Sequence, residues 1–544
     1  MSNLTTTPDS TGKETVIVDK PCSVFASSQS SSFTQSPVAE NGHSVTETAM
    51  IPPEHPFRTL ILCFDGTGDQ FDSDNSNIVQ FFSMLPKGDR TKQMVYYQAG
   101  IGTYTTPEIA SPFWSNISKF IDEAIAWNLH AHVMDGYEFL MQNYTANDRI
   151  CIFGFSRGAY IARSLAGMLH KVGLLPACNH QVSNPGLWRI GFPSLTLTVK
   201  RMQFAYKMFT TTDETGWKQS NAFKKAFSID VDIEFIGVWD TVNSVGLIPK
   251  RLPFTTSNNI VRTFRHAISL DERRAKFKPN LWNRPNDKEK LLSISDQTQQ
   301  HHHKKPRPKK KMSQRMMENK YARDRTQPTD IEEVWFAGCH CDVGGGSVDN
   351  DTTHNLARIP LRWMVRECFK TNSGIMFVYT KGLRNIGLDP DTLYPTVKPR
   401  PPALPVGTAR IQSIPRSPAP VPPQMNSAGS ETAPINASNG DVFVTEEEHD
   451  LRDALSPIYD QLTLRWFWWI LELLPFRQRY QRGDNTWVSP FRWNFGRGRF
   501  IPKQKANGVR VHRSVKMRME AQTENGGTYK PKAAFDLERT IWVD

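Results

Sequence analysis

The sequence lacks the features that mark secreted and membrane-spanning proteins. Its N-terminal region has no apolar segment of the kind found in a secretory signal, and no apolar run reaches the roughly 18 residues of a transmembrane helix. The seven cysteines are odd in number and include no C-x-x-C pair, which favours reduced thiols in an intracellular protein. We therefore expect a cytoplasmic protein, with a nuclear or peripheral-membrane location as the alternatives.

An even distribution of charge is also missing. Of the formal net charge of +12, +8 comes from residues 304–325, where ten Lys and Arg residues stand against Glu318 and Asp324. A charge so confined indicates a basic insertion rather than a basic binding face, so we expect no specific nucleic acid partner. Its K-K-P-R-P-K-K-K run is typical of a nuclear localisation signal or an anionic-surface tether, and a solvated linker is the alternative.

Metal-ligand spacing is absent as well. Cys339-His340-Cys341 is the nearest approach to it, but successive residues of a strand face opposite ways and no second ligand pair follows. We expect neither a metal nor a cofactor.

What the sequence does contain is a repeated alternation of apolar strand-like and helix-like segments. Several apolar runs end in polar residues that could do chemistry, as in an open, mostly parallel sheet with helices on both faces. Hydrophobic residues make up only 38% of the chain, which indicates a folded core diluted by disorder. We predict a disordered N-terminal segment at 1–55, a catalytic domain at 56–283 and 330–394, a basic disordered insertion at 284–329, a Pro/Ser-rich disordered insertion at 395–448, and an aromatic-rich segment at 449–544 that packs on the domain.

The most informative stretch is R-I-C-I-F-G-F-S-R-G-A-Y at 149–160. An apolar strand leads into G-x-S-x-G, and the following residues have the spacing of one buried helical face. Strand, G-x-S-x-G and helix together are typical of a nucleophile elbow, a sharp turn that presents a serine hydroxyl above the sheet. The pattern predicts Ser156 as a nucleophile. The competing interpretation is an ordinary glycine-containing turn.

A serine nucleophile needs a base and a group that orients the base. In hydrolases with this elbow the chain order is Ser, then Asp or Glu, then His. Asp240 and His340 follow strand-like runs in that order, and glycines 344–346 would let the loop after His340 fold close to the nucleophile. His512 and His266 are the alternative bases.

An oxyanion hole would use backbone N–H groups. The N–H of Arg157 and that of Gly66 or Thr67, after the first strand, are the candidates.

Five motifs together resemble the α/β-hydrolase domain of type VI secretion phospholipase effectors, which also occurs in uncharacterised fungal proteins. They are F-D-G-T-G (64–68), G-F-S-R-G-A-Y-I-A-R (154–163), G-V-W-D-T-V-N-S-V-G (237–246), H-A-I-S-L-D-E-R-R (266–274) and W-F-A-G-C-H-C-D-V-G-G-G (335–346). The resemblance covers residues 57–370 and continues more weakly to about 520. It implies an α/β-hydrolase-like fold and a lipolytic serine hydrolase with Ser156, Asp240 and His340 as its triad. We therefore predict a serine esterase of the phospholipase or lipase type, acting on a lipid or other ester. The alternative is a non-catalytic binding or scaffold protein on a hydrolase fold.

An aromatic-rich stretch, R-W-F-W-W-I-L-E-L-L-P-F-R-Q-R at 465–479, is too short to span a bilayer. Its apolar residues surround most of a helix, which favours a buried core helix. The alternative is peripheral membrane contact through Trp466, Trp468 and Trp469, with the flanking arginines facing anionic head groups.

Overall fold

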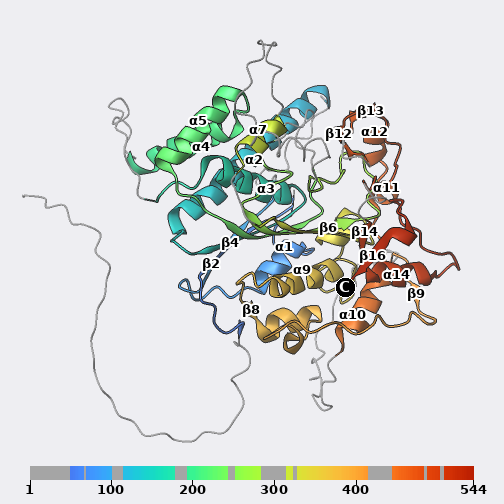
Figure 1. Cartoon of the computed structure of the whole chain (residues 1–544). Helices are drawn as coiled ribbons and strands as arrows, with labels where there is room; N and C mark the ends of the chain where they lie inside the picture. The colour runs from blue at the N-terminus through green and yellow to red at the C-terminus, as the bar shows by residue number, and fades with distance from the viewer. Residues whose placement is uncertain are drawn as a thin grey trace, which may run out of the picture. The chain divides into compact units, whose positions relative to one another are not determined.

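A computed structural model describes residues 50–66, 69–100, 114–177, 193–242, 252–283, 314–322, 327–414, 444–478, 480–482, 487–502 and 508–544 (Figure 1). For residues 114–128, 193–201, 380–381, 481 and 487 it describes the backbone alone. All of the described residues belong to one unit, which spans Val45–Asp544.

Eight strands of the described chain form one sheet in which every neighbouring pair is parallel. Their order across the sheet is β16-β14-β7-β6-β5-β4-β2-β3. The predicted α/β class with a mostly parallel sheet is thereby confirmed. The strands are β2 (Thr59–Phe64), β3 (Gln93–Gln98), β4 (Arg149–Phe155), β5 (Ile233–Trp239), β6 (Val261–Ser269), β7 (Asp330–Phe336), β14 (Val509–His512) and β16 (Thr540–Val543).

Helices cover both faces of this sheet, which explains why its strands are apolar on both sides. Figure 1 places α2 (Trp114–Asn143), α3 (Ser156–Val172), α4 (Pro193–Thr210), α5 (Glu214–Phe227) and α7 (Gln314–Lys320) on one side. It places α1 (Asn77–Ser83) and α9 (Arg358–Lys370) on the other, with α10 (Glu446–Ala454) and α14 (Arg513–Glu520) near them. None of the helices in the described part of the chain is long and apolar enough to cross a membrane.

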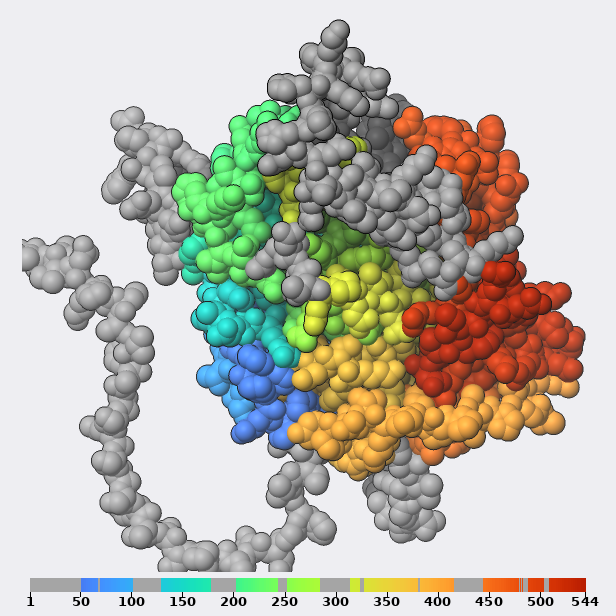
Figure 2. Space-filling view, in the orientation of Figure 1, coloured from blue at the N-terminus to red at the C-terminus, as the bar shows by residue number. Residues whose placement is uncertain are grey.

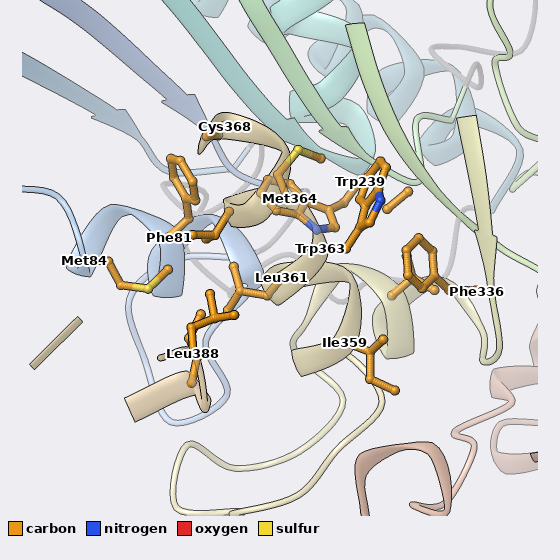
Figure 3. Close-up of a cluster of buried hydrophobic side chains, with 14 of the residues drawn as sticks. Phe81, Met84, Trp239, Phe336, Ile359, Leu361, Trp363, Met364, Cys368 and Leu388 are labelled. Carbon is orange, nitrogen blue, oxygen red and sulfur yellow. The ribbon is translucent and has the colours of Figure 1, made fainter. Parts of the chain in front are cut away.

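The alternation of strand side chains divides the interior into two cores. Leu60 and Leu62 of β2 enter the core beneath α2 and α3, whereas Ile61 and Cys63 enter the core beneath α1 and α9. Figure 3 shows the second core, in which Phe81 from α1, Trp239 from β5, and Trp363 and Met364 from α9 are buried together.

The C-terminal segment does more than pack on the domain. Its strands β14 and β16 extend the central sheet beyond β7, so residues from both ends of the described chain share one sheet. Three described elements also fall inside segments where we predicted disorder, namely β1 (Met50–Ile51), α7, and β9 (Arg410–Ile411). Residues 52–55, 321–322, 327–329, 395–409, 412–414 and 444–448 of those segments are described as well, and the remainder lies outside the described residues.

Short elements complete the described structure. They are β8 (Phe377–Val378), β10 (Phe476–Arg477), β11 (Tyr480–Gln481), β12 (Trp487–Val488), β13 (Phe491–Arg492), β15 (Gln522–Thr523), α8 (His340–Gly344), α11 (Gln461–Leu464), α12 (Trp468–Glu472), the π-helix Tyr379–Leu383, and the 3-10 turns Arg384–Ile386, Pro390–Thr392 and Leu537–Arg539.

The core helix that we favoured for residues 465–479 is wrong. Among its described residues the only helix is the short α12, which strand β10 follows. The neighbours of α12 lie on the surface, with Trp466 77% and Leu473 60% exposed. The cause is Glu472, which turns inward and accepts hydrogen bonds from the N–H groups of Ala275 (2.5 Å) and Gly496 (2.8 Å). Because the carboxylate points into the protein, the apolar residues around it face outward. Figure 2 shows this region in orange-red on the surface.

Candidate active site

Three side chains at the carboxyl ends of central strands form one hydrogen-bonded chain. Ser156 follows β4, Asp240 follows β5, and His340 opens α8 after β7. Ser156 Oγ lies 2.8 Å from His340 Nε2, and His340 Nδ1 lies 2.5 Å from Asp240 Oδ2. All three residues are buried. The structure thus places the first-choice nucleophile, base and orienting acid in the hydrogen-bonded order that general-base activation of a serine requires.

The backbone at two of these residues is strained. Ser156 has φ of +57° and Asp240 has φ of +40°, values that non-glycine residues adopt only when the surrounding structure holds them there. The glycines of G-x-S-x-G meet a different requirement, which is close backbone packing. A Cβ on Gly158 would lie 2.3 Å from the carbonyl oxygens of Phe64 and Asp65, so only glycine allows α3 to begin this close to the end of β2.

A buried arginine holds the acid of this chain. Arg499 donates to both carboxylate oxygens of Asp240, at 2.5 and 2.8 Å, and also to the carbonyl oxygens of Phe277 and Ser269. Both side chains of the Arg499–Asp240 pair are fully buried. The backbone N–H of Ser269 adds a further hydrogen bond to Asp240, at 3.0 Å. Sequence reasoning missed Arg499, because no local pattern distinguishes it from the other arginines of the R-G-R-F stretch.

The electrostatics suit a neutral base next to an ionised acid. Burial lowers the pKa of the His340 imidazole below its ordinary value, and this outweighs the raising effect of Asp240. Burial alone would raise the pKa of the Asp240 carboxyl, but Arg499 and the hydrogen bond from His340 hold it well below its usual range. At neutral pH His340 is therefore unprotonated and can accept the Ser156 proton, while Asp240 stays charged.

An aromatic contact chain leads from His340 to the protein surface. The Phe277 ring lies 4.9 Å from the His340 ring, and the Trp468 ring lies 5.7 Å from that of Phe277, both edge-on. The Arg274 guanidinium covers both Phe277 and Trp468, and its charge is paired with Glu272. Trp468 thereby connects the exposed residues around α12 to the base.

The two alternative bases lie elsewhere. His266 Nδ1 is 3.1 Å from Glu333, and its Nε2 accepts the backbone N–H of Thr241, so both of its nitrogens are engaged. His512 caps α14, with Nδ1 2.9 Å from Ser514 Oγ, and burial lowers its pKa to about 3. Neither histidine has a hydrogen bond to Ser156, so the geometry favours His340 over both.

The oxyanion-hole residues are only partly described. Arg157 is the second residue of α3, so its N–H belongs to the free N-terminal turn of that helix. The N–H of Gly66 donates to the Asp65 carboxylate at 2.8 Å, which occupies this donor. Thr67 lies outside the described residues.

Metal-binding geometry is not found among the described residues, where no group of three or more His, Cys, Asp or Glu side chains is arranged to hold an ion. Burial raises the pKa of the Cys339 and Cys341 thiols well above the usual value.

The Arg499–Asp240 pair yields a stability prediction. We expect Arg499→Met to lower the free energy of unfolding by about 3–5 kcal/mol, because it leaves a buried carboxylate without its cation. The measurement is urea denaturation. Arg510→Met is the control, since it breaks the exposed pair of Arg510 with Glu332 and should change stability little. A loss for Arg499→Met no larger than that of the control would contradict the assignment.

Comparisons with known proteins add to this geometry. A yeast protein, Uncharacterized protein YEL023C of Saccharomyces cerevisiae (strain ATCC 204508 / S288c), is 28% identical over 585 aligned residues, which cover 88% of this chain and 82% of the yeast protein. An uncharacterised protein from Pseudomonas aeruginosa is a structural match, with a TM-score of 0.29 and 16% identity over 58% of this chain and 46% of that one. The Tle1 effector bound to the VgrG spike of the type 6 secretion system is another, with a TM-score of 0.23 and 14% identity over 54% of this chain and 52% of that one. This chain therefore spans about half the length of each of these structures.

A match to a family model shows the family to which the chain belongs. Residues 58–367, more than half of the chain, match the catalytic domain of the type VI secretion system Tle1-like phospholipase effectors. This range contains Ser156, Asp240 and His340, and it agrees with the resemblance carried by the five sequence motifs. The chain belongs to the family of Tle1-like phospholipase effector catalytic domains.

Proposed function

We propose that this protein is a serine hydrolase that cleaves carboxylic esters of phospholipids. The observation that carries the proposal is the continuous hydrogen-bonded chain from Ser156 through His340 to Asp240. Membership of a phospholipase family supports a lipid ester as the substrate.

The geometry suggests the following chemistry. Ser156 Oγ attacks the ester carbonyl carbon while His340 Nε2 takes the hydroxyl proton, and Asp240 stabilises the resulting imidazolium. The N-terminal turn of α3, including the Arg157 N–H, is placed to stabilise the oxyanion. His340 then gives its proton to the leaving alkoxide as the C–O bond breaks. A water molecule, deprotonated by His340, then attacks the acyl carbon. The bond from that carbon to Ser156 Oγ breaks, the carboxylic acid leaves, and His340 returns the proton to Ser156 Oγ.

We also propose that the exposed residues around α12 contact a lipid surface. We call this set the aromatic surface, and it consists of Trp466, Phe467, Trp469, Ile470, Leu473 and Leu474, each at least 38% exposed. Such a patch suits the boundary between lipid head groups and acyl chains.

Charge favours an anionic membrane as its occupant. Arg465, Arg477 and Arg482 are exposed along the same segment. Within the described residues of 461–500, Glu472 is the only carboxylate, and it is buried. Because Trp468 links this region to His340, lipid held there would lie near the base.

The catalytic proposal predicts the effect of removing the nucleophile. Ser156→Ala should lower kcat on short-chain phospholipid and p-nitrophenyl esters by roughly 10²-fold to 10⁶-fold, because only oxyanion stabilisation and binding remain. Ser164→Ala is the matched control, since Ser164 lies on the same helix and its hydroxyl donates to the Tyr160 carbonyl. Ester hydrolysis at the wild-type rate in Ser156→Ala would contradict the proposal and favour a binding or scaffold protein.

The aromatic surface predicts selective vesicle binding. We expect co-sedimentation with vesicles containing phosphatidylglycerol, and a roughly 10-fold or greater loss of affinity in Trp466→Ala/Leu473→Ala, because two apolar side chains no longer leave water. Phe227→Ala/Leu537→Ala removes exposed apolar residues elsewhere and should bind like wild type. Circular dichroism checks folding. A folded Trp466→Ala/Leu473→Ala protein with undiminished vesicle binding would show that the aromatic surface is not the site of lipid contact.

A further inference from the structure

A cavity of about 190 Å³ lies beside the segment that carries Arg499. One wall comes from residues 278–281, which follow Phe277, and the other from described residues between Gln478 and Pro502. The lining residues that matter to its chemistry are Lys278, Asn280, Arg492, Trp493, Arg497 and Phe500.

Three cations line this cavity, and none of them has an acidic partner among the residues that the structure describes. Among the residues that the structure describes, no Asp or Glu lies within ion-pair distance of Lys278, Arg492 or Arg497. The Lys278 Nζ donates only a long hydrogen bond, of 3.3 Å, to the Arg497 carbonyl oxygen. Burial lowers the pKa of the Lys278 ammonium to about 8, which marks a cation that lacks full compensation. An anion in the cavity would supply that compensation.

Asn280 forms a fixed part of the cavity wall. It is only 1% exposed, yet neither the oxygen nor the nitrogen of its side-chain amide has a hydrogen-bond partner in the described structure. Its backbone is fixed, because its N–H donates to the Thr241 carbonyl (2.8 Å) and its carbonyl accepts from Arg163 (2.5 Å). Because both amide atoms are enclosed by the protein, Asn280 shapes the wall and does not itself contact a group in the cavity.

The residues that line the cavity are next in the chain to residues that contact the candidate active site. Thr241, which anchors Asn280, is the neighbour of Asp240 in the chain. Gly498 and Phe500 line the cavity and stand on either side of Arg499 in the chain, and Arg499 donates hydrogen bonds to Asp240. Phe277, which precedes Lys278, contacts the His340 ring. A ligand that fills this cavity therefore lies against the segments that hold the acid and the base.

We propose that this cavity is an anion subsite that takes the phosphate group of the phospholipid whose ester reaches Ser156. The inference rests on the proposed function for its substrate. The two arginines suit paired hydrogen bonds to phosphate oxygens, and Lys278 adds a point charge. Trp493 and Phe500 offer apolar contact to the glycerol carbons beside the phosphate.

The test compares two monomeric substrates, so that membrane binding plays no part. We measure kcat/KM for dihexanoyl phosphatidylglycerol, below its micelle concentration, and for p-nitrophenyl butyrate, which has no phosphate. In Arg492→Gln/Arg497→Gln the ratio of the first to the second should fall roughly 10-fold or more, chiefly through KM of the phospholipid, because charge-assisted hydrogen bonds to phosphate are lost.

The control removes two arginines from exposed ion pairs away from the cavity. Arg262→Gln/Arg510→Gln should keep the wild-type ratio, because Arg262 pairs with Glu234 and Arg510 with Glu332. If the ratio of the two kcat/KM values in Arg492→Gln/Arg497→Gln equals that of the control, the proposed subsite is contradicted. An equal loss of kcat/KM on both substrates gives the same ratio and contradicts it too.

Calorimetry with sn-glycerol 3-phosphate tests the subsite apart from catalysis. Wild type should bind sn-glycerol 3-phosphate saturably, and Arg492→Gln/Arg497→Gln should not. The same binding result is expected even if the protein hydrolyses neither ester. Lack of hydrolysis would refute the proposed function but not the subsite. Absence of binding to wild type would refute the subsite. Glycerophosphoglycerol should bind at least as tightly as inorganic phosphate, since the reverse order would identify a site for free phosphate and overturn the head-group assignment.

Discussion

The structure around the site depends on one fully buried ion pair, between Asp240 and Arg499. A carboxylate removed from water is strongly destabilising unless a cation and hydrogen bonds compensate it, and Arg499, His340 and Ser269 provide them here. Arg499 lies 259 positions from Asp240 in the chain. Since the arginine reaches the acid only when its segment is docked, the order of the candidate triad depends on the C-terminal part of the protein. This dependence gives a physical reason for β14 and β16 to share the central sheet.

The same C-terminal segment carries the two surfaces through which a lipid would approach. The aromatic surface lies before Arg499 in the chain, and the cationic cavity lies on both sides of it. Trp468 and Phe277 connect the first to His340, while Asn280 and Thr241 connect the second to Asp240. In the proposed mechanism, substrate recognition and the orientation of Asp240 and His340 therefore depend on the same few segments, and the sheet holds the strained backbone at Ser156 and Asp240.

Local patterns predicted the part of the site that local backbone geometry determines. G-x-S-x-G after an apolar strand located Ser156, and strands ending at Asp240 and before His340 placed both residues at one edge of a parallel sheet. The glycines that follow His340 already favoured it over His266 and His512 in the sequence, but only the tertiary structure supplies its contacts with Ser156 and Asp240. Arg499 could not be predicted, since its role arises from a contact between distant segments. The misjudged burial of residues 465–479 has the same origin. Composition predicted a helix there, but the inward turn of Glu472 depends on the backbone of Ala275 and Gly496.

The most direct test of the central claim is the pH dependence of fluorophosphonate labelling, with the modified residue identified by mass spectrometry. The account predicts an adduct on Ser156 whose rate of formation is constant above neutral pH. Because the pKa of His340 is lowered by burial, the rate should fall as pH drops through a single midpoint below 6.5, where protonation removes the base. An adduct on another residue, a rate that does not vary with pH, or a midpoint above 6.5 would contradict it.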